Sequence, residues 1–306
     1  MMSERARLTG FLLLLGCGWG LTTPLIKITV TAGYQPFGII FWQMLIGAVL
    51  LGVLRWRQMG RMPVTVKTLA VWLMIATIGT LIPGTASFRA AFHLPSGIMS
   101  IVIATIPMMA FPIALALGND RFSIRRLAGL CLGLIGVGLI ALPEASLPER
   151  AMIAFLPLAL VAPFCYACEG NIVARWGTAG LDPFQALFGA SAIGTVIALP
   201  LALGSGQFFV PAAPFILADL TLLVGSIVHV LVYAGYVWLI ARAGSVFAGQ
   251  VSYVVTGSGV FWAMLLLGET YSVWIWLALL CMGIGLSLVQ PWLAEPKPLG
   301  ETEVHG

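Results

Sequence analysis

The chain has 306 residues, of which 60% are apolar and only 8% are charged, and its mean hydropathy is +1.04. A water-soluble fold of this size could not hide so apolar a composition, so soluble globular classes are excluded. The net charge of +4 is not gathered into a basic cluster, so a nucleic-acid-binding protein is not indicated either.

Ten apolar segments follow one another along the chain, and each is long enough to cross a bilayer. A hydrocarbon core of about 30 Å requires roughly 20 helical residues. Barrel strands are excluded because runs such as 127–142 have no polar residue on either face. Since helices satisfy their own backbone in lipid, we predict an all-α integral membrane protein. The expected spans are 8–31, 36–54, 67–90, 96–117, 124–142, 151–174, 182–203, 214–240, 246–267 and 271–291.

Positive charges lie mostly on one side of these spans, which predicts the orientation of the chain. With a cytoplasmic N-terminus, three basic residues fall outside, namely Lys27, Arg89 and Arg150. The other twelve fall inside, where basic loops are retained: Arg5, Arg7, Arg55, Arg57, Arg61, Lys67, Arg121, Arg125, Arg126, Arg175, Arg242 and Lys297. We therefore expect both termini in the cytoplasm, a bacterial inner membrane, and a disordered cytoplasmic tail over 293–306.

The two halves of the chain repeat each other weakly. Offsets of 147 and then 149 residues superimpose similar positions in order, which are Trp19 and Tyr166, Pro36 and Pro183, Phe37 and Phe184, Gly47 and Gly194, Asp120 and Glu269, and Gly136 and Gly285. We predict one five-helix repeat over 1–145 and a second over 146–292. Because five is odd, the second repeat must be inverted in the membrane, a plan common among alternating-access transporters.

A polar stripe runs along the eighth expected span and has a counterpart in the third. Ser226, His229, Tyr233 and Tyr236 are spaced for one helical face, and subtraction of 149 gives Thr77, Thr80, Gly84 and Ser87. Polar side chains inside spans often mark a substrate path, although hydroxyls also hold helices together. The paired stripes favour a cavity between the repeats.

The candidate substrate-binding residues are the polar and aromatic ones near mid-span, and Glu169 and His229 are also candidates for proton coupling. For His229 the alternative is a neutral imidazole bonded to a neighbouring helix, and for Trp19 and Tyr166 it is packing in the core. Lys27 is expected to extend toward the membrane surface. The substrate-binding set is Trp19, Thr80, Tyr166, His229, Tyr233, Tyr236 and Tyr253.

Two loop motifs carry a resemblance to a known family. The segment 117–123, with Gly129 and Gly136 after it, resembles the closing stretch of an EamA-type repeat, and 268–272 leading to Gly285 resembles a second copy. The chain thus resembles the ten-helix branch of the drug/metabolite transporter superfamily, and is most similar to YddG-type exporters of aromatic amino acids. This resemblance implies export of amino acids by alternating access.

Motifs for chemistry are missing from the sequence: there is no phosphate-binding loop, no zinc-protease motif and no serine-hydrolase motif. We expect no enzyme activity, no metal, no cofactor and a monomer whose partners are the bilayer and a small solute. A weakly charged aromatic cavity suits a neutral amino acid or related metabolite. Two alternatives remain open, an intramembrane enzyme using His229 with Tyr233 on a lipid-linked substrate, and a passive channel.

Overall fold

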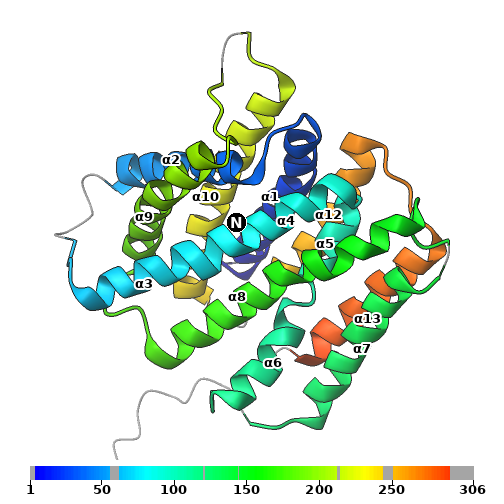
Figure 1. Ribbon diagram of the computed structural model, residues 1–306. Coiled ribbons are helices and arrows are strands. Elements are labelled where there is room, and N and C mark those ends of the chain that lie inside the picture. Colours follow the sequence, from blue (N-terminus) through cyan, green and yellow to red (C-terminus); the bar gives the residue numbers. More distant parts are fainter. Residues whose placement is uncertain are drawn as a thin grey trace, which may run out of the picture.

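The structure is a computed structural model that describes residues 4–55, 62–119, 121–143, 145–211, 214–243 and 251–289, and in these ranges it is helical (Figure 1). The helices of the first half are α1 (Glu4–Thr31), α2 (Pro36–Arg55), α3 (Val66–Ala76), the π-helix η1 (Thr77–Leu81), α4 (Ile82–His93), α5 (Ser96–Ile103), α6 (Ile106–Ala116) and α7 (Ile124–Ala141). Those of the second half are the 3₁₀-helix η2 (Arg150–Phe155), α8 (Leu156–Trp176), α9 (Pro183–Gly204), α10 (Leu217–Ala243), α12 (Val251–Leu267) and α13 (Val273–Val289).

Eight helical segments of the described chain are long and apolar enough to cross a membrane. They coincide with the first eight spans expected from the sequence, to within a few residues at each end. The expected ninth and tenth spans correspond to the shorter apolar helices α12 and α13. The fold is therefore that of an all-helical, multi-pass membrane protein.

Three of the expected spans are not continuous α-helices. In the sixth, the 3₁₀-helix η2 precedes α8. In the third, η1 separates α3 from α4. In the fourth, Ala104 and Thr105 donate to the carbonyls of Ile101 and Val102, which tightens the chain between α5 and α6. Pro107 explains this break, because proline has no N–H to continue the helix that precedes it.

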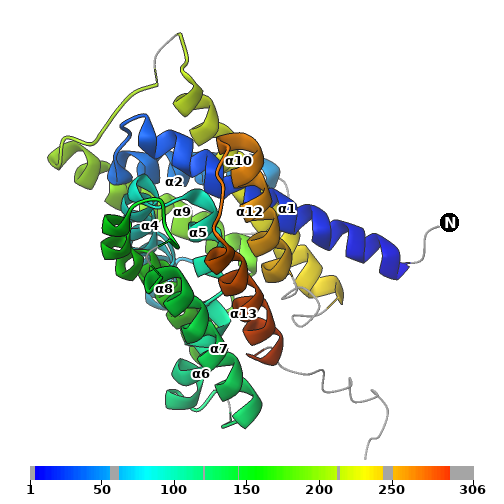
Figure 2. The same ribbon diagram turned by 90° about the vertical axis from the view of Figure 1, so that its right-hand side faces the viewer.

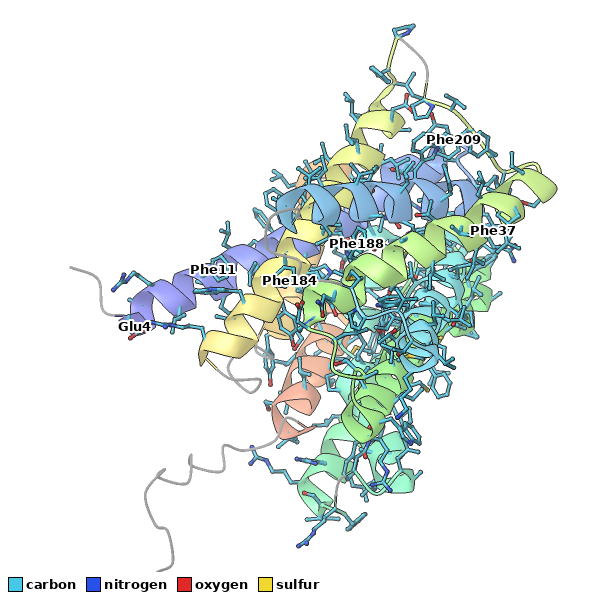
Figure 3. The ribbon with its side chains drawn as sticks, turned by 90° about the vertical axis from the view of Figure 1, so that its left-hand side faces the viewer. Glu4, Phe11, Phe37, Phe184, Phe188 and Phe209 are labelled. Carbon is cyan, nitrogen blue, oxygen red and sulfur yellow. The ribbon has the colours of Figure 1, made fainter. Side chains whose placement is uncertain are left out.

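Helices from the two halves of the chain pack on each other throughout the bundle. Of the first-half helices, α1 lies against α10 and α12 of the second half, α2 and α3 lie against α9, and α5 lies against α12. In turn α8 lies against α4 and α6, and α2 also contacts α10. We call the face where α1 begins the N face and the opposite one the far face; Figure 3 shows Glu4 at the N face and Phe37 and Phe209 at the far face.

Helices α7 and α13 form a close pair at one side of the bundle, as Figures 1 and 2 show. Glycines make the approach possible: a Cβ on Gly285 would lie 2.7 Å from the carbonyl oxygen of Gly129, and one on Gly136 would lie 2.6 Å from Met282 Cγ. Small residues let helix backbones approach closely in membranes. This pair belongs to the scaffold.

Replacing Gly285 with alanine tests this packing. The new methyl group meets backbone, which cannot rotate away, so α7 and α13 must separate, at a cost of about 1–3 kcal/mol. We expect Gly285→Ala to lower the apparent melting temperature of the detergent-purified protein. The matched control is Gly283→Ala on the same helix, where a Cβ meets nothing within 4 Å. Equal melting temperatures for the two variants would contradict the packing described.

At the far face, charged side chains close the ends of α4 and α5. Lys27 Nζ donates to the carbonyls of Ala91, Phe92 and Leu94 at 2.7, 3.0 and 3.0 Å. Lys27 thus reaches the C-terminal end of α4, next to the short connection to α5. Carbonyls at a helix C-terminus lack partners within the helix and carry partial negative charge, which attracts an ammonium group.

Glu269 performs the complementary task at the start of α5. Its carboxylate accepts hydrogen bonds from the backbone N–H of Ser96 at 2.7 Å and of Gly97 at 3.1 Å. Tyr271 donates its hydroxyl to the same carboxylate. A carboxylate at a helix N-terminus satisfies free N–H groups and matches the helix dipole. The loop before α13 is thus fastened to the start of α5.

A second far-face link joins the α1–α2 loop to the start of α10. The Tyr34 hydroxyl donates to Asp219 Oδ1 at 2.6 Å, and burial together with this carboxylate raises the pKa of Tyr34 to about 12. Nearby, the Phe37 N–H donates to Gln207 Oε1 at 3.0 Å. Residues from both halves of the chain therefore hold each other at this face.

Candidate functional site

The centre of the bundle holds an aromatic cluster around Trp19 of α1. Its ring lies 6.0 Å from that of His229, 6.2 Å from that of Tyr233 and 5.7 Å from that of Tyr236, each in an edge-on geometry. The three partners occupy one face of α10. Four of the residues predicted from the sequence are thus brought together by two helices that are far apart in the chain.

These side chains line a hollow. His229 lies deep among protein atoms, yet its side chain is accessible to water-sized probes. Tyr233 lies equally deep and is only partly covered, whereas Ser226, one turn before His229, is fully buried. A group that is surrounded by protein and still accessible must face an internal space. Along α10, the accessible or partly accessible His229, Tyr233 and Tyr236 follow the buried Ser226 in the direction of the N face.

The hydrogen-bond partners separate residues that hold helices together from residues that are available to a ligand. Thr77, Ser226 and Thr256 each donate to a carbonyl four residues earlier in their own helix. In the part of the chain that the structure describes, six polar side chains of the predicted set make no hydrogen bond, which are Thr80, Tyr166, His229, Tyr233, Tyr236 and Tyr253. Among the described residues, the His229 imidazole is therefore not bonded to a neighbouring helix.

Glu169 of α8 enters this hollow opposite the π-helix. A Cβ on Gly79 would lie 2.8 Å from both carboxylate oxygens of Glu169, so the carboxylate rests directly on the backbone of η1. It interacts electrostatically with Tyr166 on its own helix and with Tyr233 on α10. Glu169 therefore connects the two predicted stripes, and Thr80 follows Gly79 on the opposite wall.

Tyr253 lies apart from the Trp19 cluster. With Thr256 it lines a cavity of about 600 Å³ between α12 and α13, where Ala104 and Trp276 are also found. No ring contact joins it to Trp19 in the described residues. Spacing along α12 placed Tyr253 at the right depth, but it could not show toward which neighbour that helix face turns.

Gly79 is the site residue that sequence reasoning missed. A search for polar and aromatic side chains cannot find a glycine, yet a methyl group at this position would occupy the place of the Glu169 carboxylate. A π-helix turn widens the backbone and is often found at functional sites. A glycine beside the polar Thr80 in mid-span was the only available signal.

Accessibility of the hollow can be measured with cysteine labelling. In a variant without the five native cysteines, His229→Cys should react with a small water-soluble thiol reagent, because this position faces the hollow. Ser226→Cys, one turn away and 2% exposed, should react at least ten times more slowly. Similar rates at both positions would show that the hollow is absent. Reaction of the denatured variants controls for intrinsic reactivity.

The chain was compared with known proteins. No curated protein matches it. Similar solved structures include a crystal structure that is 16% identical over 94% of this chain and 98% of that chain, with a TM-score of 0.59, which shows a shared fold. Residues 8–142, which cover α1 to α7, match the EamA-like transporter family.

Proposed function

We propose that this protein is an EamA-type secondary transporter that exports neutral amino acids, aromatic ones among them, and related small metabolites. The observation that carries the proposal is the central cluster of Trp19 with His229, Tyr233 and Tyr236, whose polar groups make no hydrogen bond within the described residues. Glu169 relates this cluster to Tyr166 on α8 and to η1, which holds Thr80. Polar groups without partners are costly inside a membrane protein, so a site that retains several of them suits a solute that supplies the missing bonds. The family match of residues 8–142 supports transport.

The pattern of helix contacts supports two inverted repeats. Moving five spans along the chain replaces α1 by α8, α2 by α9, α3 and α4 by α10, α5 and α6 by α12, and α7 by α13. Under this exchange the contact of α1 with α10 becomes that of α8 with α4, and the contact of α3 with α9 becomes that of α10 with α2. The pairs α2 with α9, α5 with α12 and α7 with α13 map onto themselves. A two-fold relation between 1–145 and 146–292 accounts for all of these contacts.

Alternating access follows from such a relation, because each half can adopt the arrangement of the other. Toward the N face, α1 diverges from α6 and α7 in Figures 2 and 3. The far face carries the links of Lys27, Glu269 and Tyr34. We assign this conformation as open at the N face, which the distribution of basic residues places in the cytoplasm.

The alternative functions have less support. An intramembrane enzyme would need a base next to its nucleophile, and His229 and Tyr233 share no hydrogen bond in the described chain although both contact Trp19. A passive channel would need a path through the far face, where hydrogen bonds join the two halves. A carrier with one closed face agrees with both observations.

Transport by reconstituted protein tests the proposal. We expect saturable uptake of radiolabelled phenylalanine, threonine or methionine into proteoliposomes, and counterflow when the vesicles are preloaded. Trp19→Ala and His229→Ala should each reduce the rate about tenfold or more, because they remove a wall of the hollow. Trp176→Ala, whose ring is 66% exposed at the end of α8, serves as the matched control. Absence of saturable flux for all three solutes would remove the substrate assignment, and normal flux in both site variants would make these residues packing elements.

A further inference from the structure

We infer that the hollow selects solutes that carry a positive charge beside an aromatic group, with Glu169 as the partner of a ligand ammonium group. This inference rests on the proposed transport function and narrows its substrate class, which was amino acids and related small metabolites, to the amphipathic amines among those metabolites. It follows from the charges and ring faces at the site.

Glu169 has unused hydrogen-bonding capacity. Its carboxylate lies against Gly79 and accepts no hydrogen bond and forms no ion pair with any residue in the described ranges. A buried carboxylate normally requires several donors or a cation, because its ionised form is otherwise poorly solvated. A ligand that brings an ammonium group supplies both.

Two positively charged side chains of α1 and α8 are directed elsewhere. Lys27, the lysine that lies within α1, has its three donors engaged with α4 and Leu94. Arg175 is exposed at the end of α8, and among the described residues no basic side chain acts on Glu169. The carboxylate of an amino acid would therefore enter the hollow without a cationic partner, whereas its amino group would find Glu169.

Aromatic side chains lie close to Glu169. Trp19 and Tyr233 lie edge-on with ring centroids 6.2 Å apart, and Glu169 acts electrostatically on both Tyr233 and Tyr166. Ring faces attract cations within about 6 Å, and tryptophan does so most strongly. A carboxylate between aromatic rings therefore favours an organic cation with an apolar part over a zwitterion of the same size.

A series of ligands that share a 2-phenylethyl group separates the possibilities. Binding of 2-phenylethylamine, phenylalanine, 2-phenylethanol and 3-phenylpropionate to the purified full chain would be measured by the quenching of tryptophan fluorescence. We expect the amine to bind at least ten times more tightly than phenylalanine, and 3-phenylpropionate to bind most weakly. Equal or tighter binding of phenylalanine would overturn the inference and leave transport of amino acids in place.

Substitutions then assign the effect to Glu169. Glu169→Gln should weaken binding of the amine at least tenfold and leave 2-phenylethanol unchanged, whereas Glu149→Gln, at an exposed position, should change neither. Gly79→Ala, which adds a methyl group 2.8 Å from the carboxylate, should weaken amine binding in the same selective way and decides the matter if Glu169→Gln does not fold. Unaltered amine binding in either folded variant would contradict the assignment. If no ligand of the series is bound or transported by the unmodified protein, the proposed function itself fails.

Discussion

Every polar group in this chain that lies in hydrocarbon must find a partner within the protein, and the rest of the architecture follows from that requirement. Continuous helices meet it by themselves. Where the chain turns between α4 and α5, the ends of two helices are left open within the bundle. Lys27 closes one end and Glu269 closes the other, so that side chains from α1 and from the loop before α13 supply what the backbone cannot.

The same requirement makes the centre of the molecule conspicuous. Most hydroxyls within the helices, such as those of Thr29 and Ser226, donate to the carbonyl one turn earlier. Around Trp19 the pattern differs: polar side chains from η1, α8 and α10 face an accessible space and make no hydrogen bond to another described residue. Rigid scaffold pairs such as α7 and α13 lie to one side of this space, so the bonding capacity is concentrated where the two halves of the chain meet.

Much of the fold could be predicted from the sequence, because hydrophobic length and helical spacing are local properties. The spans and the stripe from His229 to Tyr236 depend on little else. The break at Ala104 and the π-helix at Gly79 could not be located from periodicity, since both depend on how a neighbouring helix meets the backbone. Tyr253 shows the limit from the other side: its depth was readable, but the direction of its helix face depends on tertiary packing.

The closure of α4 by Lys27 also has a consequence for which residues position 27 can hold. Its three bonds run from one nitrogen to oxygens of Ala91, Phe92 and Leu94, which surround that atom in three directions. An ammonium group points its hydrogens outward as a tripod, whereas a guanidinium group is flat and places its hydrogens in one plane. Arginine keeps the charge but not this shape. Lys27→Arg, although commonly treated as a mild substitution, would therefore leave at least one of these oxygens without a hydrogen bond.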